Sequence, residues 1–402
     1  MERWKKGLFV VAGAQMMVTA AAQTSTPLLP FFLAELGVTE PRAVRRWAGM
    51  LAGVNALFTG MFSPVWGSLS DRYGKKPMLL RSAASIAVFT FLTGCAGNVQ
   101  HVLLLRVLQG AFSGFSAAAL SLLGALVPRE HFAFAVGLLQ AGQIMGLLLG
   151  PLLGGVLADF FPYRLVFRLG SLLALAALLV ILVCVKEETS GGETRARGGG
   201  LKLRGFFRHA GLKAAFTVIF LTQFAVRGVE PLIPLFVFEL VGKVPALNTL
   251  VGLAMALQGV SSALGAALTG RVAARVGHRK FLLLNLVMAA TLYFPQAATG
   301  NIWAFMGLRA VQGFFLGGLL PATNSLIGAM TPLEIRGSVY GLTSSAFFFG
   351  NFLGPLVTSF LSAHLGLRAV FLVAAGILYL NLIWIWGNIK ERGGAEAGQE
   401  ES

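Results

Sequence analysis

Four ionisable side chains lie within apolar stretches of this sequence: Arg106, Arg227, Glu230 and Arg309. Removing a charge from water is costly, so an ionisable group inside an apolar segment is a candidate for function. A carboxylate such as Glu230 can bind and release a proton when its surroundings change from wet to dry. Three arginines against one carboxylate give a net positive site, which favours neutral or anionic amphiphiles over cationic ones as bound molecules.

Glu230 and a second acidic residue, Asp159, also have simpler structural explanations. Arg227 and Glu230 are three positions apart on one predicted helix, where the alternative is that they simply neutralise each other. Asp159 lies at the predicted outer end of another apolar stretch and is a second candidate for proton coupling. The alternative for Asp159 is helix capping or snorkelling to the membrane interface.

No arrangement typical of an enzyme accompanies these residues. The histidines are isolated from one another, without the HExxH, GxSxG or Walker spacing that metal, nucleophile or nucleotide chemistry requires. Cys95 and Cys184 lack the paired spacing of a metal site or a disulfide framework. We therefore expect no enzyme, no metal site and no cofactor, with a proton gradient as the energy source.

The composition indicates which environment positions these side chains. Of 402 residues, 56% are hydrophobic and 12% are charged, about half of the roughly 25% charged residues of soluble proteins. Most of the surface must therefore face lipid. The net charge of +16 does not indicate nucleic-acid binding, because the basic residues fall between apolar stretches, as in loops that meet an anionic leaflet.

The chain carries the same set of signatures twice, 203 or 204 positions apart. This self-similarity indicates two halves of equal fold and equal orientation. The first apolar stretch belongs to the repeat, so we expect a spanning helix there and not a cleaved signal peptide. The paired positions include Pro27 and Pro231, Glu35 and Glu239, Gly74 and Gly277, Arg106 and Arg309, Gln109 and Gln312, Gly150 and Gly354, and Arg164 and Arg368.

The repeat also completes the expected binding site with neutral polar residues. Gln23 and Thr26 occupy the positions that match Arg227 and Glu230 in the other half, so the symmetry is broken where specificity is expected. The expected substrate cavity therefore comprises Gln23, Thr26, Arg106, Arg227, Glu230, Arg309 and Gln312.

Each half contains six apolar segments, and each segment is long enough to cross a bilayer, which takes about 20 residues. We expect an all-α membrane protein with twelve transmembrane helices in two six-helix bundles. Most of the 32 Lys and Arg lie inside when both termini are cytoplasmic, as the positive-inside rule requires. Arg42, Arg45 and Arg46, in the first outer loop, depart from this rule. The expected parts are an N-terminal bundle at 1–185, a cytoplasmic linker at 186–212, a C-terminal bundle at 213–388 and a cytoplasmic tail at 389–402.

Three motifs resemble those of a known family. The run from Gly67 to Lys76, GSLSDRYGKK, resembles the loop 2-3 signature of the major facilitator superfamily, and Arg106-x-x-Gln109-Gly110 resembles its helix-4 signature. Residues 142–155 resemble the helix-5 signature of drug:proton antiporters. The resemblance covers the chain apart from linker and tail, and it is closest to the MdtG-like multidrug-efflux branch.

The resemblance implies a secondary active transporter of the cytoplasmic (inner) membrane, in which two bundles expose a central cavity to one side at a time. We expect proton-coupled export of drugs or other amphiphilic small molecules by a monomer in the lipid bilayer. Two alternatives stay open: a carrier of sugars, phosphorylated metabolites, organic anions or lipids, and a non-transporting receptor or scaffold on the same fold.

The resemblance also assigns two conformational elements. The first is a helix-5 motif that comprises Gly146, Gly150, Pro151, Gly154 and Gly155. It either flexes during transport or serves ordinary close packing of helices. A cytoplasmic latch comprises Gly67, Asp71, Arg72, Gly74, Lys75 and Lys76. The resemblance implies that Asp71 contacts the start of helix 11, near Glu334 and Arg336, where an anion is stabilised by the helix dipole. The alternative is a basic loop that only sets topology.

We predict that Asp71→Asn lowers transport while leaving membrane insertion intact, because the amide keeps the size of the side chain and removes the charge that the helix terminus attracts. Transport in membrane vesicles, normalised to the amount of inserted protein, measures the effect. Turnover equal to that of the wild type would show that Asp71 is no latch.

Overall fold

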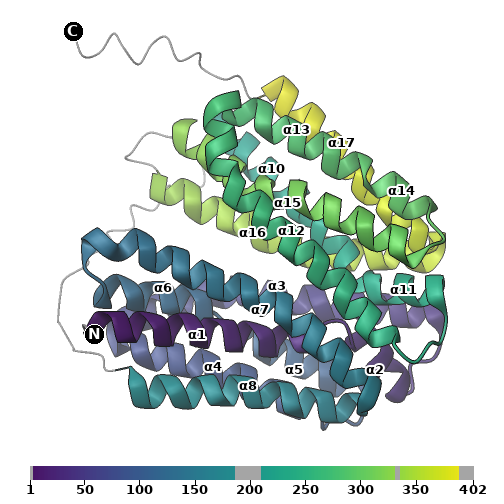
Figure 1. The fold of residues 1–402 in the computed structure, drawn as a ribbon, viewed down its shortest axis with the longest axis horizontal. Helices are drawn as coiled ribbons and strands as arrows, with labels where there is room; N and C mark the ends of the chain where they lie inside the picture. Colours follow the sequence, from purple (N-terminus) through teal and green to yellow (C-terminus); the bar gives the residue numbers. More distant parts are fainter. Residues whose placement is uncertain (1–2, 186–209, 331–335, 389–402) are drawn as a thin grey trace.

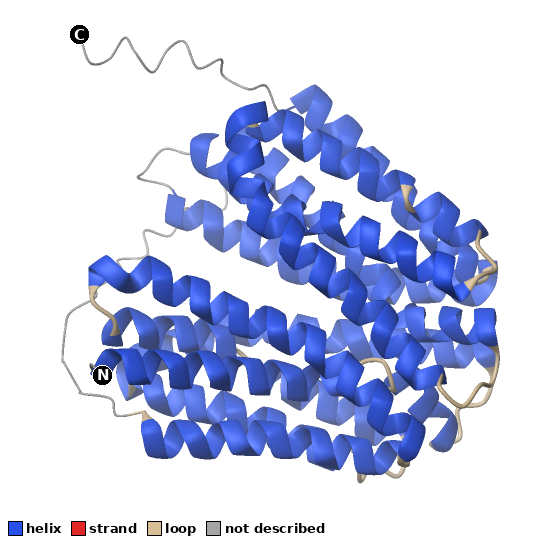
Figure 2. Ribbon diagram, in the orientation of Figure 1, coloured by secondary structure: helices blue, strands red, loops and turns tan. Residues whose placement is uncertain are grey.

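The computed structural model describes residues 3–185, 210–330 and 336–388. Within these ranges the protein is helical and contains no strand (Figure 2). The expected tail at 389–402 and residues 186–209 of the expected linker lie outside the described residues. The last three positions of that linker belong to helix α10, which begins at Ala210, and the division into two bundles stays a prediction.

The helices of the two halves follow each other in equivalent order (Figure 1). The first half comprises α1 (Arg3–Thr24), α2 (Leu29–Glu35), α3 (Pro41–Tyr73), α4 (Lys75–Thr93), α5 (Val99–Ala111), α6 (Phe115–Leu126), η1 (Arg129–His131), α7 (Phe132–Phe160) and α8 (Tyr163–Cys184). The second half comprises α10 (Ala210–Val229), η2 (Glu230–Leu232), α11 (Ile233–Val241), α12 (Leu247–Val276), α13 (His278–Thr291), α14 (Tyr293–Ala298), α15 (Ile302–Met330), α16 (Arg336–Leu365) and α17 (Leu367–Asn388).

Ten stretches of the described chain are long and apolar enough to cross a membrane. They are α1, α3, α5 with α6, η1 with α7, α8, α12, α13 with α14, α15, α16 and α17. The helices α4 and α10 stand in the places of the two remaining expected segments.

Residues that recur in the sequence contact one another within the first half. Arg164, at the start of α8, lies 3.9 Å from the Glu35 carboxylate at the end of α2 and donates a hydrogen bond to the Ala96 carbonyl at 2.8 Å. The rings of Phe32 and Phe167 pack beside this pair, with centroids 4.9 Å apart. These contacts join α2, α8 and the turn that follows α4.

The second half repeats the same arrangement. Arg368 lies 3.3 Å from the Glu239 carboxylate and donates to the Ala297 carbonyl at 3.1 Å. The ring centroids of Phe236 and Phe371 are 4.8 Å apart. The sequence repeat therefore corresponds to one clamp of an ion pair and two rings, used once in each half.

The glycines Gly74 and Gly277 recur because each joins two helices through an unusual backbone conformation. Their φ angles are +96° and +95°, in a region where a side chain is strained and glycine is not. Gly74 connects α3 to α4, and Gly277 connects α12 to α13. Turn geometry alone is therefore enough to require glycine at both positions.

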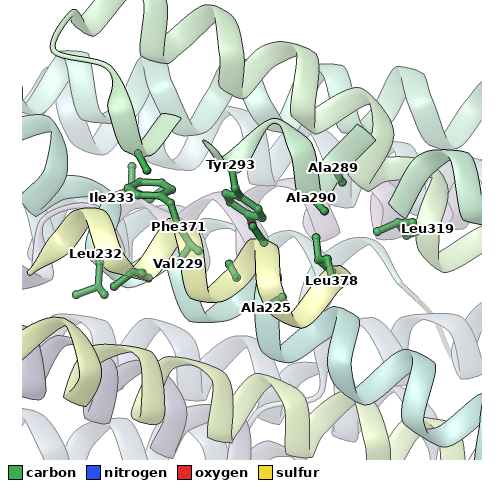
Figure 3. Close-up of a cluster of buried hydrophobic side chains, with 14 of the residues drawn as sticks. Ala225, Val229, Leu232, Ile233, Ala289, Ala290, Tyr293, Leu319, Phe371 and Leu378 are labelled. Carbon is green, nitrogen blue, oxygen red and sulfur yellow. The ribbon is translucent and has the colours of Figure 1, made fainter. Parts of the chain in front are cut away.

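Each half has its own apolar core. In the second half, Ile233, Tyr293 and Phe371 belong to one large buried cluster (Figure 3). In the first half, Leu8 and Phe32 belong to two separate clusters. Lipid is as apolar as these side chains, so the bundles are held by tight van der Waals packing more than by the hydrophobic effect.

The glycines of the helix-5 motif bring α7 into close contact with α1. A Cβ added at Gly146 would come within 2.6 Å of the Met16 carbonyl oxygen, and one at Gly150 within 2.7 Å of the Ala20 carbonyl oxygen. Glycine at every fourth position lets two helix backbones approach each other. The motif therefore packs α7 closely, which was one of its two interpretations, and its flexing stays a prediction.

The two halves meet at the end of the molecule away from the N-terminus, and their ribbons diverge toward the N-terminus (Figure 1). There α3 packs along α16, and α7 packs along α12. Gly49 lies against the Pro355 carbonyl and Gly252 against the Pro151 carbonyl, so that neither site has room for a side chain. We call this end the closed end, which holds residues 45–60, 151–159, 248–252 and 348–364.

We predict that Gly146→Ala destabilises the protein, because the new methyl group would overlap the Met16 carbonyl and overpacking costs about 1–3 kcal/mol. Gly137→Ala, in the same helix, is the matched control, since nothing lies within 4 Å of a Cβ built there. The apparent melting temperature in detergent should fall by at least about 2 °C for the first variant and stay unchanged for the second. Equal melting temperatures would contradict the close packing of α7 on α1.

Candidate functional site

Both halves interrupt a helix at the same place in the repeat. Residues 25–28 separate α1 from α2, and η2 separates α10 from α11. Pro27 and Pro231 stand in these breaks, and a proline has no backbone N–H with which to continue the helical ladder. Unwound backbone at membrane depth is tolerated where protein buries it or where it lines a cavity. The breaks therefore indicate where a polar site can form.

A cavity of about 270 Å³ lies between the halves at these breaks. This volume is just below the roughly 300–1,000 Å³ of common ligand pockets, so the cavity fits a small solute in this conformation. Its apolar wall consists mainly of alanines, leucines and prolines. Its polar lining comprises Gln23, Thr26, Asn55, Arg106, Gln109, Ser113, Arg227, Glu230 and Asn351.

Arg106 reaches the cavity from α5 and is held by neutral groups. Its Nη1 donates to Gln109 Oε1 at 3.0 Å, and its Nη2 donates to Ser25 Oγ at 3.3 Å. Its buried Nε has no hydrogen-bond partner, and no carboxylate pairs with the guanidinium, among the described residues. Arg106 therefore brings an uncompensated positive charge to the cavity wall, where it can bind an anionic or polar group.

Glu230 forms an ion pair within the cavity lining. Its Oε2 lies 2.6 Å from Arg227 Nη1, and the two side chains are 28% and 38% exposed. The neutralising pair predicted from the spacing is therefore formed, and the charge state of one accessible carboxylate sets the local charge.

Five of the seven residues expected to form the substrate cavity line it together. Besides the three charged residues Arg106, Arg227 and Glu230, these are Gln23 and Thr26. Thr26 Oγ1 donates to Gln23 Oε1 at 2.9 Å, which orders the break between α1 and α2. That these residues bind substrate stays a prediction.

The other two, Arg309 and Gln312, are absent from the lining of this cavity and are buried inside the second half. Arg309 is 3% exposed, and its guanidinium carbon lies 5.7 Å from the centre of the Phe305 ring. Gln312 donates to the Ala289 carbonyl at 2.9 Å and accepts from Gln296 Nε2 at 2.9 Å.

The two halves also differ in the residues on the neighbouring helix. At the repeat offset of 203, Tyr293 and Gln296 of the second half stand where the first half has Thr90 and Thr93. Gln296 donates to Gln312 at 2.9 Å, whereas Thr90 accepts from Gln109 at 3.2 Å, and Tyr293 belongs to the same buried cluster as Phe305. Alignment of α5 with α15 alone could not predict this difference.

Besides Gln109, which it assigned only to the helix-4 motif, sequence reasoning missed four polar residues of the site. Ser25 accepts a hydrogen bond from Arg106, and Asn55 Nδ2 donates to the Arg106 carbonyl at 3.2 Å. Ser113 and Asn351 also line the cavity. Ser25 could have been found, because it stands in the proline-marked break. The other three carry no charge and belong to helices whose rotation the sequence does not specify.

Asp159, the second candidate for proton coupling, lies at the closed end, outside the cavity lining. Its carboxylate accepts hydrogen bonds from the backbone N–H groups of Asn248 and Thr249, at 3.0 and 2.9 Å. These are the first residues of α12, so Asp159 caps a helix of the other half. The helix cap that was the alternative interpretation of Asp159 is therefore present in the structure.

The decisive side chains of the expected cytoplasmic latch lie outside the described part of the chain. This holds for the side chains of Asp71 and Arg336 and for the whole of Glu334. The contact between Asp71 and the start of α16 therefore stays a prediction.

The remaining latch residues have local contacts. The Arg72 guanidinium lies 5.4 Å from the centre of the Tyr73 ring, and Lys76 Nζ donates to the Leu182 carbonyl at 3.0 Å. Gly67 lies within α3, with open space where its side chain would be. The described residues contain no cluster of three or more metal-ligating side chains.

Comparison with known sequences decides the family. The sequence model of the Major Facilitator Superfamily matches residues 11–247 and 244–401. The chain belongs to the Major Facilitator Superfamily. Two relatives named multidrug resistance protein MdtG, from Escherichia fergusonii and Citrobacter koseri, are each 33% identical to it over 390 residues, which is 97% of this chain and 96% of each relative. This superfamily member is thus a multi-pass secondary transporter and not an enzyme.

Solved structures share its fold. A bacterial homologue of the human lysosomal transporter Spinster, inward-facing and occupied, has a TM-score of 0.79 at 15% identity and covers 96% of this chain and 97% of that one. A D-xylose–proton symporter has a TM-score of 0.79 at 15% identity, with coverage of 97% and 99%. The human organic anion transporter MFSD10 has a TM-score of 0.70 at 18% identity, with coverage of 96% and 100%. At these identities the likeness extends to the fold alone.

Proposed function

We propose that this transporter exports amphiphilic small molecules from the cell in exchange for protons, by alternating access and without a cofactor. The observation that carries the proposal is a cavity between the two halves that contains one accessible carboxylate among arginines. The relatives named multidrug resistance protein MdtG support the substrate class and the direction. The protein acts as a monomer in the cytoplasmic (inner) membrane.

The membrane topology is part of the proposal. Twelve helices span the bilayer when α4 and α10 are added to the ten apolar stretches, and both termini are cytoplasmic because the basic residues gather on that side. The closed end then faces outward and the diverging halves face the cytoplasm. The conformation described is therefore inward-facing, ready to accept a molecule from the cytoplasm or the inner leaflet.

Protonation of Glu230 is the coupling step that we propose. An ionised Glu230 holds Arg227 at 2.6 Å, so that the pair is neutral and Arg106 remains the free cation of the cavity. A proton on Glu230 removes the ion pair and leaves two uncompensated arginines in the wall. The free energy of closing the cavity to water therefore differs between the two charge states. Such a difference can link proton binding to the direction in which the cavity opens.

The cavity charge favours a second candidate, a carrier of organic anions. With Glu230 paired to Arg227, the free guanidinium of Arg106 makes the lining net positive. A carboxylate or phosphate on a substrate would accept hydrogen bonds from Arg106 in place of Ser25 and Gln109. Neutral and anionic amphiphiles are therefore expected to bind better than cationic ones.

We predict that Glu230→Gln abolishes transport driven by a pH gradient, because the amide cannot exchange a proton. The matched control is Glu239→Gln, whose carboxylate is also paired with an arginine, 3.3 Å from Arg368, but lies outside the cavity lining. Substrate flux in proteoliposomes under an imposed pH gradient should fall to background in the first variant and persist in the second. Undiminished flux in Glu230→Gln would reject Glu230 as the coupling residue, and no flux in the wild type would favour the receptor or scaffold.

We predict that Arg106→Gln weakens the binding of organic anions by about tenfold or more, the effect of losing a hydrogen bond to a charged group. Binding of a cationic dye should stay the same or improve. Fluorescence titration of the purified protein with one anionic and one cationic dye measures both affinities. Arg168→Gln, on an exposed residue outside the cavity, is the control. Equal loss for both dyes would show that Arg106 supports the structure of the cavity and does not select charge.

A further inference from the structure

One carboxylate accepts several hydrogen bonds across the contact between α7 and α12 at the closed end. Asp159 Oδ1 accepts from the backbone N and from Nδ2 of Asn248, both at 3.0 Å. Asp159 Oδ2 accepts from the backbone N of Thr249 at 2.9 Å and from its Oγ1 at 2.5 Å. All four donors belong to the first turn of α12, where the helix dipole favours an anion. One residue of the first half thus completes the hydrogen bonding of a helix in the second half.

Two cations add polar contacts between α3 and α16 at the same end. Arg45 Nη1 donates to the Ser362 carbonyl at 2.8 Å, and Arg46 Nη2 lies 3.4 Å from His364 Nε2. Arg46 also lies over the Phe360 ring, 5.3 Å from its centre. Ser362 and His364 belong to the last turn of α16, where the helix dipole favours a cation. We call these two contacts, between α7 and α12 and between α3 and α16, the two seams. At each seam one half supplies the charge that is favourable at the helix end of the other half.

The two seams use equivalent positions of the repeat. Asn248 Nδ2 donates to the Ala158 carbonyl at 3.3 Å, and Arg45 donates to the Ser362 carbonyl. Asn248 stands 203 positions after Arg45, and Ser362 stands 204 positions after Ala158. The same side-chain-to-carbonyl contact thus closes both seams, and Asp159 is added on one of them. These contacts also give a structural role to Arg45 and Arg46, which lie in the first turns of α3 and depart from the positive-inside rule.

We propose that these contacts form an outer latch: Asp159 with Asn248 and Thr249 on one seam, and Arg45 with Ser362 on the other. The latch holds the closed end shut in the inward-facing state, and both seams must part before the cavity can open outward. Asp159 then sets the balance between the two states and does not carry the transported proton. The assignment of the closed end to the outer side rests on the proposed topology, whereas the latch itself rests on the contacts alone.

Removing the charge of Asp159 tests the latch. Asp159→Asn keeps the shape of the side chain but places an amide N–H₂ against donors of α12. The fraction of molecules whose closed end is open should therefore rise about tenfold, which is the effect of losing a good helix cap. Arg45→Gln should shift the same balance in the same direction. Because the seams share no residue, the shifts of the two single variants should add in the double variant.

Distances between two spin labels on the full-length protein measure that fraction. The labels are placed at Arg168 and Lys243, exposed residues of the two halves, after Cys95 and Cys184 have been replaced by serine. Double electron–electron resonance spectroscopy of the protein in nanodiscs, without substrate or pH gradient, should show a larger long-distance population in Asp159→Asn than in the wild type. Glu35→Gln is the matched control, since its carboxylate pairs with Arg164 of the same half and touches neither seam.

The results separate the latch from the proposed function. An unchanged distance distribution in Asp159→Asn, at wild-type melting temperature, overturns the latch whatever the transport activity. A shifted distribution supports it even if the wild type moves no substrate. If Asp159→Asn does not fold, Thr249→Val removes one donor to Asp159 and keeps the carboxylate. It should give a smaller shift in the same direction, and no shift in Thr249→Val and Arg45→Gln would equally overturn the latch.

Discussion

A polar group at membrane depth has no water to bond with, so it needs a partner inside the protein. This constraint explains where the polar residues of the transporter gather. Arg227 and Glu230 pair with each other beside a break in the helix, and Asn381 in α17 bonds to the Val218 carbonyl and to Thr222. Lipid-facing surfaces cannot satisfy such groups, so a cavity with a polar wall forms where the two halves face each other.

The same constraint determines how the halves hold together. Gly49 and Gly252 let α3 and α12 approach the opposite half so closely that backbone meets backbone. Contacts through glycine bury few large apolar side chains, so the seams need directed bonds at their ends to stay closed. Asp159 provides such bonds by accepting from backbone N–H groups that the start of α12 leaves free, and Arg45 adds a donor to the Ser362 carbonyl near the end of α16. Helix ends thus become the points where the two halves are joined.

The functional asymmetry of the transporter arises from a few changes to a symmetrical scaffold. The clamps of Arg164 with Glu35 and of Arg368 with Glu239 keep both halves alike at their ends. In the middle, Thr90 is replaced by the larger Tyr293 in the second half, and Arg106 is open where Arg309 is buried. A repeated fold therefore yields one cavity with one set of charges, because Arg106 lines it whereas the equivalent Arg309 is buried in the second half.

The sequence by itself determined the membrane class, the repeat, the helical fold and five residues of the cavity, because apolar length, fixed offset and isolated charges such as Glu230 are local properties of the chain. It also offered the pairing of Arg227 with Glu230 as one of two interpretations, since three positions on a helix bring side chains together, and the pair is formed. Only the tertiary structure decided that Arg309 is covered, that Asn55 and Ser113 join the lining, and that Asp159 caps α12. Those outcomes depend on helix rotation and on contacts between segments far apart in the chain, which are set by the packing of whole helices against each other.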